Sequence, residues 1–446
     1  MTKQVFIDKL FAEKHGCNNQ FFSNCRLLNV RKRIVMRNLF TVRKVLLSLY
    51  VALVAYVPTV TADTVTDWNK QAGDIVVAAN IGPLPAERTL AIVQAAVYEA
   101  VNAITRRYPI SDLKLQSEPS ASIEAAIAAA NRAVLMQLIP NQITAIDKAY
   151  QATITVIKDE AARKSGIAIG EQAAQGILAM RIQDGAFDQE TYRPITSAGV
   201  YIPTVIPETP QWAARKPWLM KNAAQFRPAA PPQLNSERWA RDYNEVKALG
   251  RFDSQVRTAE QTEIARFWEE VMPPIYHGIV RSVATQSGRE ITQNARLFAA
   301  VTQASDDALI AVFDAKYHYG LWRPLTAIRN GDIDGNDATE RDASWKPFID
   351  TPMHPEYPCA HCIVSAAVGT VLQGEIGNHQ SPVLKTVSKA AGNVSRSWNS
   401  IDAFMQEVIN ARIYDGVHYR NSGEIGAQMG KQVAKLAIEK YQLGKE

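Results

Sequence analysis

The chain has 446 residues, of which 47% are hydrophobic and 21% charged, as expected for a globular protein with a substantial core. Its formal net charge of +5 is concentrated at the N-terminus, where residues 1–62 hold 10 Lys and Arg but only 2 Asp and Glu. Residues 63–446 then carry 39 basic and 42 acidic side chains, a net charge of −3. This mildly acidic balance argues against an electrostatic nucleic-acid binder.

The first 62 residues contain a pattern typical of an export signal. Basic residues precede an apolar run at 45–57, which is too short to span a bilayer comfortably, and a small-residue cleavage pattern ends at Ala62. We expect residues 1–35 to be a non-native extension, with Met36 the true start, and residues 36–62 to be a signal peptide. The alternative is an uncleaved anchor. We therefore expect a periplasmic or secreted protein.

Helical periodicity dominates the rest of the sequence, and no β-alternating series or fixed-period repeat appears. In the first half, apolar residues recur at helical spacing in residues 85–107, 120–138, 141–164 and 167–182. In the second half, the same spacing predicts helices at residues 236–249, 258–271, 287–317, 361–375, 402–414 and 422–442. We therefore predict an all-α protein.

Residues 185–235 differ in character from both halves. They contain eight prolines and little periodicity, which predicts a long ordered loop that wraps the surface. We divide the mature chain at the end of this loop. Residues 63–235 form an N-terminal helical region that includes the loop, and residues 236–446 form a C-terminal helical catalytic domain.

The acidic loop at residues 330–342 is similar to a calcium-binding loop, because Asp332, Asp334 and Asn336 alternate along it. Its sixth position, however, is Asp337 instead of Gly, and its twelfth is Ala343 instead of Glu. We expect a hydrogen-bonded turn at this place.

Five of the seven histidines fall between residues 318 and 418, which directs attention to three short segments of the C-terminal half. In the first, KYHYGLWRP (316–324), Lys316 and Arg323 are seven residues apart, and on one helix both would leave the same face. Aromatic residues around two cations predict an anion-binding pocket that is partly shielded from water. A core-facing helix with outward-reaching Lys and Arg fits the same pattern.

The other two segments contribute the histidines. In HPEYPCAHC (354–362), Ala360 and His361 directly precede an apolar helical run, so they lie near a helix N-terminus, where free N–H groups favour an anion. In ARIYDGVH (411–418), Arg412 and His418 would diverge by about 120° on one continuous helix. A bend near Gly416 would bring both side chains to one site.

Together these segments resemble the three-part signature of the vanadium-dependent haloperoxidases and the type 2 phosphatidic acid phosphatases. That signature is Lys, six residues and Arg-Pro, followed by Pro-x-x-His and then by Arg, five residues and His. The match spans residues 316–418, and AAVYEAVNAI at 95–104 is similar to the soluble bacterial haloperoxidase-like branch. The resemblance implies helical bundles of the haloperoxidase and acid phosphatase type around a site for a tetrahedral oxyanion.

Carried over by position, the resemblance gives each residue a role. Four groups would bind the oxyanion: the side chains of Lys316, Arg323 and Arg412 and the N–H of Ala360. His418 would be the axial ligand of vanadate, or the nucleophile that attacks phosphorus, and His361 would be the acid–base group. His354 occupies a position near the family's halide site, although a histidine that only packs in this loop is the alternative.

The sequence departs from the family pattern at several positions. Cys359 and Ala360 replace the usual Ser-Gly before the histidine, and Ala411 replaces a Ser. Ser422 stands where an Asp usually orients the axial histidine, so it could orient His418 only weakly, or could instead cap the last helix. These changes bear on activity more than on fold.

Cys359 and Cys362 are the only cysteines after residue 62. In an exported protein they could form a disulfide that locks the turn presenting His361 and removes a thiol from the neighbourhood of peroxide. Two reduced, buried thiols that pack like small apolar residues are the alternative.

Three functions fit these observations. The first is an exported vanadate-binding haloperoxidase-like enzyme that oxidises halide with hydrogen peroxide. The second is an acid phosphatase that needs no vanadate and hydrolyses phosphate esters through a phospho-His418 intermediate. The third is a catalytically idle helical protein that binds phosphate. The length of the chain favours the first, with small-molecule substrates, no nucleic acid, and no stable membrane insertion after processing.

Overall fold

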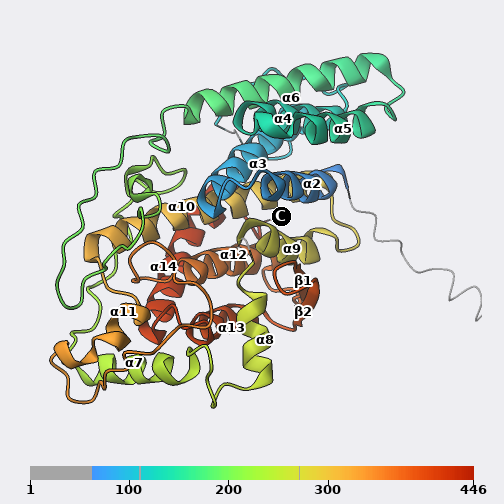
Figure 1. Cartoon of the computed structure of the whole chain (residues 1–446). Coiled ribbons are helices and arrows are strands. Elements are labelled where there is room, and N and C mark those ends of the chain that lie inside the picture. Colours follow the sequence, from blue (N-terminus) through green and yellow to red (C-terminus); the bar gives the residue numbers. More distant parts are fainter. Residues whose placement is uncertain (1–62, 110–111, 271, 446) are drawn as a thin grey trace, which may run out of the picture. The chain divides into compact units, whose positions relative to one another are not determined.

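The computed structural model describes residues 63–109, 112–270 and 272–445 (Figure 1). The predicted N-terminal extension and signal peptide lie outside these residues. The described part consists of packed layers of helices and a two-stranded sheet, which confirms the all-α prediction. None of its helices combines the length and the apolar character needed to cross a bilayer.

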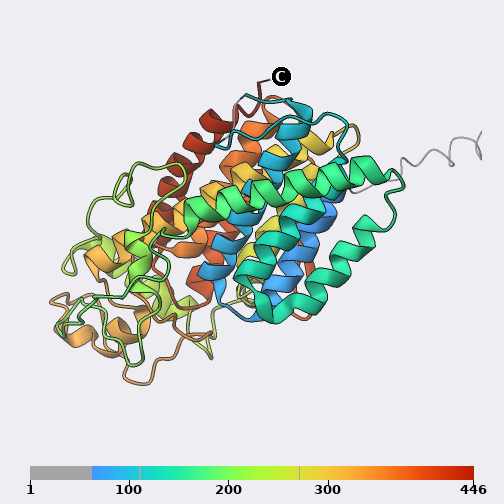
Figure 2. The same cartoon turned by 90° about the horizontal axis from the view of Figure 1, so that it is seen from above.

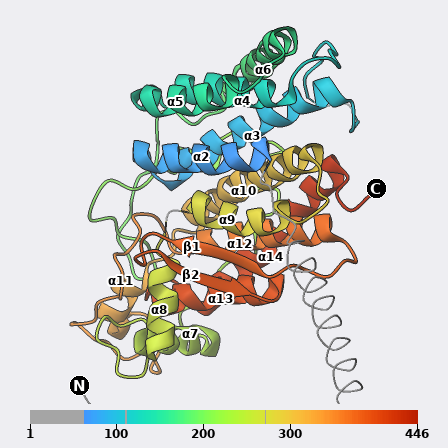
Figure 3. The ribbon, with the colours of Figure 1, turned by 90° about the vertical axis from the view of Figure 1, so that its right-hand side faces the viewer.

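The N-terminal helices form the outer layers. They are α2 (Thr64–Ala79), α3 (Pro83–Thr105), α4 (Ile123–Leu138), the 3-10 turn η1 (Pro140–Gln142), α5 (Ile143–Ile154) and α6 (Glu160–Arg181). Figure 3 shows α4, α5 and α6 outermost, with α2 and α3 between them and α10. Figure 2 shows α6 lying across the outer face of this group. The helix predicted at 141–164 is two helices, because Asp159 caps a new one by accepting from the N–H of Ala162.

The segment between α6 and the next long helix is irregular, apart from the 3-10 turn η2 (Pro210–Ala214), as its prolines predict. It is held by backbone hydrogen bonds to the chain directly after α10. The N–H of Tyr201 donates to the carbonyl of Gly320 (2.7 Å), and the N–H of Trp322 donates to that of Gly199 (3.0 Å). This loop therefore braces the segment between Lys316 and Arg323.

The C-terminal half supplies the remaining elements. Its helices are α7 (Glu237–Leu249), α8 (Ala259–Phe267), α9 (Met272–Ala284), α10 (Ile291–Tyr319), α11 (Pro324–Arg329), the 3-10 turn η3 (Gly331–Ile333), α12 (Ala360–Ile376), α13 (Ile401–Tyr414) and α14 (Arg420–Tyr441). Strands β1 (Leu384–Ser388) and β2 (Val394–Trp398) form an antiparallel hairpin in which Leu384 faces Trp398. Periodicity did not reveal the hairpin because Thr386 and Ser388, two polar residues, take buried positions of β1.

One hydrophobic core joins the two halves. It runs without interruption from α2 and α3 through α10, which is buried along most of its length, to α12 and α14. Glycines let α14 approach α12 closely, since a Cβ at Gly430 would lie 2.1 Å from the carbonyl oxygen of Ile363 and one at Gly426 would lie 2.7 Å from that of Cys359. This packing fixes the N-terminus of α12, where His361 lies.

Candidate active site

Lys316 and Arg323 lie on either side of a helix break. Lys316 is in the last turn of α10, which ends at Tyr319 because Gly320 takes the left-handed conformation with φ +60°. Arg323 is the N-cap residue of α11, whose first residue is Pro324. The expectation that both cations leave one face of a single helix is therefore wrong. The chain turns between them and directs both side chains to the loop that precedes α12.

Both cations are buried and hold that loop through its carbonyl groups. Lys316 Nζ donates to the carbonyl oxygens of Pro355 (2.9 Å) and Glu356 (2.8 Å). Arg323 Nε donates to the carbonyl of His354 (2.8 Å). Within the described residues neither cation has a carboxylate at ion-pair distance. A buried positive charge without an acidic partner is costly and favours the binding of an anion.

His354 packs beside Arg323 at the edge of this cluster. Its ring nitrogen Nδ1 lies 3.0 Å from an Arg323 Nη, and its ring centroid lies 5.0 Å from that of Phe313. Burial lowers the pKa of His354 well below its usual range, and the charges of Lys316 and Arg323 lower it further. A neutral ring here accepts from the guanidinium and helps to position it.

The N-terminus of α12 presents two unused backbone donors. Cys359 is the N-cap residue, and its sulfur accepts from the N–H of Cys362 at 3.2 Å. Ala360 and His361 are the first two helical residues, so their N–H groups have no intrahelical acceptor, and no other described residue accepts from them. Ala360 and His361 thus lie at a helix N-terminus, as the sequence predicts, and anion binding there stays a prediction.

Arg412 and His418 are brought together by the turn that the sequence predicted at Gly416. Helix α13 ends at Tyr414, Gly416 has φ +78°, and the N–H of His418 donates to the carbonyl of Arg412 (3.2 Å). A Cβ at Gly416 would lie 2.3 Å from the carbonyl oxygen of Gly250. Only glycine therefore fits both the backbone conformation and the close approach of α7.

The ring of His418 is oriented by Glu356, which the sequence analysis did not single out. Its Nδ1 lies 2.7 Å from Glu356 Oε1 and its Nε2 lies 3.3 Å from an Arg323 Nη. Because guanidinium can only donate, Nε2 accepts, and Nδ1 carries the proton that Glu356 accepts. The lone pair of Nε2 therefore faces the cation cluster.

Ser422 has a smaller part in this arrangement than its position suggested. Its hydroxyl lies 3.4 Å from His418 Nδ1, at the outer limit of a hydrogen bond. The expectation that it caps the last helix is wrong, because α14 begins at Arg420 with Tyr419 as the N-cap residue. Glu356 thus supplies the carboxylate that is missing at residue 422.

The charges of Lys316, Arg323 and Arg412 act on both candidate histidines, His361 and His418. Desolvation lowers the pKa of His361 and of His418 well below the usual range, and Arg412, Lys316 and Arg323 lower both further. Burial also lowers the pKa of Arg323 to about 10 and that of Lys316 well below its usual range. The three basic side chains thus surround two imidazoles that stay neutral.

Arg412 is paired with a buried carboxylate but keeps a free donor. One Nη lies 2.6 Å from Asp415 Oδ2, whereas its buried Nε has no hydrogen-bond partner among the described residues. Burial raises the pKa of Asp415 to about 7, with the Arg412 charge opposing the shift. The orphaned Nε, together with the free N–H of Ala360, fits a group with several anionic oxygens, such as vanadate or phosphate.

Cys359 and Cys362, the cysteines of the described residues, are free thiols and are buried. Of the two states that the sequence analysis left open, the structure therefore has the reduced one. Burial raises the pKa of Cys362, whereas its hydrogen bond to Cys359 and the charge of Arg412 lower that of Cys359. Cys359 serves in place of the usual serine as the cap of α12.

The acidic loop at 330–342 is a hydrogen-bonded turn, as predicted. The carboxylate of Asp334 accepts from the Asn336 N–H (2.9 Å), the Thr339 hydroxyl (2.7 Å) and Trp239 Nε1 (3.0 Å). No group of three His, Cys, Asp or Glu side chains in the described ranges is arranged to hold a metal ion.

Comparison with known proteins finds a family model that matches part of the C-terminal half. Residues 296–444 match the family model of the VCPO second helical-bundle domain. This match contains all of Lys316, Arg323, His361, Arg412 and His418. No curated protein matches the chain significantly.

Solved structures extend the similarity to most of the chain. A bacterial vanadium-dependent iodoperoxidase has 24% sequence identity and a TM-score of 0.72, over 84% of this chain and 95% of that one. A bacterial vanadium-dependent chloroperoxidase has 17% identity and a TM-score of 0.66 in its apo form, over 81% of this chain and 94% of that one. Its holo form has 18% identity and a TM-score of 0.63, over 82% of this chain and 93% of that one.

Proposed function

Since the chain has the fold of the vanadium haloperoxidases, we propose that it is a vanadate-binding haloperoxidase-like enzyme that oxidises halide with hydrogen peroxide. The observation that carries the proposal is the buried cluster of Lys316, Arg323 and Arg412 around His418. The lone pair of His418 Nε2 faces an Arg323 Nη there, while Arg412 Nε and the N–H of Ala360 have no partner among the described residues. The names of the similar structures favour peroxidase over phosphatase chemistry.

Lys316, Arg323, Arg412 and the N–H of Ala360 would hold the oxygens of the anion. Lys316 uses two of its three N–H donors on carbonyl groups and has one to offer. Arg412 offers Nε. Arg323, whose Nη contacts His418 Nε2, would exchange that contact for an oxygen of the anion. Bound vanadate would supply Lewis-acid activation of peroxide toward the halide.

His418 would hold the anion through Nε2. Glu356 holds the proton on Nδ1, so the lone pair needed for ligation is already directed at the site before the anion arrives. Fixing the tautomer in this way removes a reorganisation step, and it makes Glu356 a positioning residue.

His361 would move the protons. It lies at the helix N-terminus beside Ala360, and it makes no side-chain hydrogen bond to any described residue. Three nearby cations keep it neutral, so it can take a proton from peroxide and later return it to the departing oxygen. His354, packed against Phe313 and Arg323, would form one wall of the halide site.

A phosphatase is the second candidate, and one observation favours it. The cluster that fits vanadate also fits phosphate, and the oriented lone pair of His418 Nε2 is suited to attack on phosphorus. Hydrolysis of phosphate esters would then proceed through phospho-His418. A catalytically idle phosphate-binding protein would share the cluster but show neither activity.

The test uses the chain from residue 63 to 446 with and without orthovanadate. Bromination or iodination with hydrogen peroxide and hydrolysis of a phosphate monoester are measured side by side. We expect halide oxidation only with vanadate, its loss in His418→Ala, and vanadate binding weakened by at least about tenfold in Arg323→Gln. Vanadate-independent ester hydrolysis that is lost in His418→Ala would replace the first proposal with the second, and binding without either activity would leave the idle protein.

We also propose that the enzyme acts in the periplasm or outside the cell, after removal of residues 36–62. The support is the export pattern in the sequence. N-terminal sequencing of the protein recovered from the extracytoplasmic fraction should begin at Asp63. Recovery only from the cytoplasm, with the N-terminus intact, would contradict export.

A further inference from the structure

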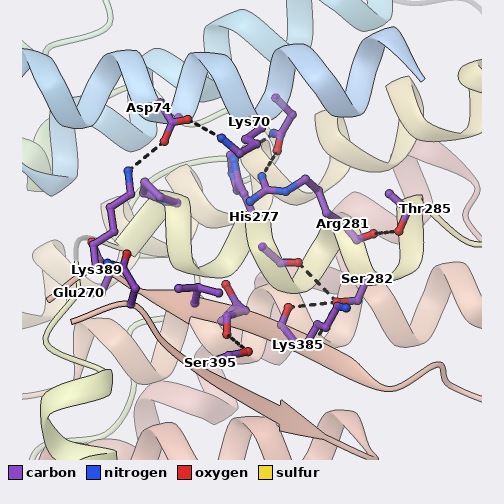
Figure 4. A pocket seen from close by; sticks show the side chains of 17 residues that line it. Lys70, Asp74, Glu270, His277, Arg281, Ser282, Thr285, Lys385, Lys389 and Ser395 are labelled. Carbon is purple, nitrogen blue, oxygen red and sulfur yellow. Dashed lines mark hydrogen bonds and ion pairs between the residues drawn. The ribbon is translucent and has the colours of Figure 1, made fainter. Parts of the chain in front are cut away.

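A cavity of about 450 Å³ lies between α2, α9 and the β1–β2 hairpin (Figure 4). This volume lies within the range of small-molecule sites. Its walls include polar and charged side chains from all three elements: Asn69, Asp74, His277, Arg281, Lys385 and Lys389. None of these residues belongs to the proposed active site.

The carboxylates around this cavity are already engaged. Asp74 pairs with Lys70 at 2.8 Å and with Lys389 at 3.0 Å, the contacts drawn in Figure 4. Glu270 accepts from the N–H of Ala390 at 2.7 Å. The lining therefore has more cations than acidic groups to pair with them, and the surplus favours a negatively charged ligand.

Two lining cations, Arg281 and Lys385, have no ion pair among the described residues, and Arg281 is the less exposed of the two. Its guanidinium donates to Asn69 Oδ1 at 2.7 Å, and no carboxylate of the described residues lies at ion-pair distance. Arg281 is partly buried. The fully buried arginines outside the cation cluster, in contrast, each have an ion pair: Arg88, Arg181, Arg215 and Arg296.

In this respect Arg281 resembles Arg323, the central cation of the proposed active site. Burial lowers the pKa of both to about 10, and neither has a carboxylate at contact distance within the part of the chain that the structure describes. Such an arrangement is stable when an anion completes it.

Arg281 is held in position by Asn69, which in turn contacts His277. Because Asn69 Oδ1 accepts from Arg281, the Asn69 amide nitrogen must donate to His277 Nδ1, at 3.0 Å. His277 is buried, and burial lowers its pKa to about 3, so the ring is neutral and serves as the acceptor. The Asn69–His277 pair thus holds one side of the guanidinium, whose other N–H groups make no hydrogen bond to a described residue.

We propose that this cavity is a second ligand site, which binds a small molecule carrying a carboxylate or phosphate group on Arg281. Lys385 and Lys389 lie at the rim and attract the anion, and Arg281 donates to its oxygens in the interior. This site is independent of the proposed function. It lies on α9 next to Tyr276, whose hydroxyl donates to the carbonyl of His361 (3.1 Å), so the same helix contacts both sites.

The test separates the two anion sites by mutation. In an Arg323→Gln background, which disables the cation cluster, inorganic phosphate and succinate are titrated by calorimetry. We expect saturable binding of at least one of them, weakened by about tenfold or more when Arg281→Gln is added. Lys385→Gln should weaken it by about two- to threefold, and Lys431→Gln, an exposed lysine of α14, should have no effect.

Two outcomes overturn the proposal: no saturable binding of either anion, or equal binding with and without Arg281. A preference for phosphate over succinate, or the reverse, identifies the headgroup. Should Arg281→Gln not fold, as judged by near-ultraviolet circular dichroism, Arg281→Lys and a crystal structure of the unmutated chain soaked in each anion replace it. Absence of the anion oxygens from Arg281 in those crystals would then reject the site.

Discussion

Glu356 shows how one residue compensates for a departure from a family pattern. The pattern places a carboxylate four residues after the axial histidine, where this chain has Ser422. In the structure the carboxylate comes from the loop before α12, 62 residues earlier than His418, and reaches Nδ1 at 2.7 Å. A carboxylate thus contacts His418 Nδ1 although it comes from a different position in the sequence.

We expect Glu356→Gln to weaken orthovanadate binding by about 10- to 100-fold, the usual effect of losing the outer partner of a ligating histidine. An amide can donate to Nδ1 and so favours the tautomer in which Nε2 carries a proton and cannot ligate. Vanadate titration followed by tryptophan fluorescence measures the effect. Ser422→Ala is the control and should change affinity little, and Ser422→Asp added to Glu356→Gln should restore part of it. Unchanged affinity in Glu356→Gln would remove this residue from the site.

Asp415 makes a pH-dependent contribution to stability. Burial raises its pKa from the ordinary value of 3.8 to about 7. Between these values the folded protein keeps a proton that the unfolded chain has released, so the contribution is present below about pH 4 and is lost as pH rises to about 7. Relative to Asp415→Asn, the free energy of unfolding of the unmutated protein should fall by about 1.4 kcal/mol per pH unit in this window. Urea denaturation across the window measures it, and parallel pH profiles would contradict it.

At the scale of elements, the turn between α13 and α14 decides whether the site exists. Gly416→Ala places a Cβ 2.3 Å from the carbonyl oxygen of Gly250 at φ +78°, which must shift the backbone that connects Arg412 to His418. We expect a loss of stability greater than the roughly 1 kcal/mol of backbone strain alone, together with loss of vanadate binding. Gly288→Ala is a matched control, since its φ is +84° and nothing lies within 4 Å of its Cβ. It should lower stability slightly and leave vanadate affinity unchanged. Equal effects of the two substitutions would show that strain, and not the close contact, dominates.

The elements that the sequence predicted well are those with long apolar periodicity, and those it missed have identifiable reasons. Helix α9 was not predicted because Pro273 and Pro274 suggest a break, yet both fall in its first turn, where a missing N–H costs little. The spacing of Lys316 and Arg323 correctly predicted that both side chains reach one place in the molecule. It wrongly predicted a single continuous helix between them, because α10 ends before Gly320.

Motif spacing cannot reveal partners that tertiary packing supplies. Glu356 is an ordinary acidic residue in the sequence, and it gains its role only when the loop before α12 meets His418. The cavity around Arg281 is likewise formed by three elements that are far apart in the chain.

At the scale of the whole molecule, the shared core predicts that the two halves unfold together. Leu90 of α3 lies in the N-terminal half, is fully buried, and belongs to the same core as the helices that carry the site. Leu90→Ala should therefore lower the free energy of unfolding by about 2–5 kcal/mol. In a single cooperative unit this loss shifts every probe equally. We expect far-ultraviolet circular dichroism and tryptophan fluorescence, to which eight tryptophans contribute, five of them after residue 235, to report one coincident transition in both proteins. If Leu90→Ala lowered the midpoint of the dichroism transition while the fluorescence midpoint stayed in place, residues 63–235 and 236–446 would be independent folding units, and the common core would not couple them.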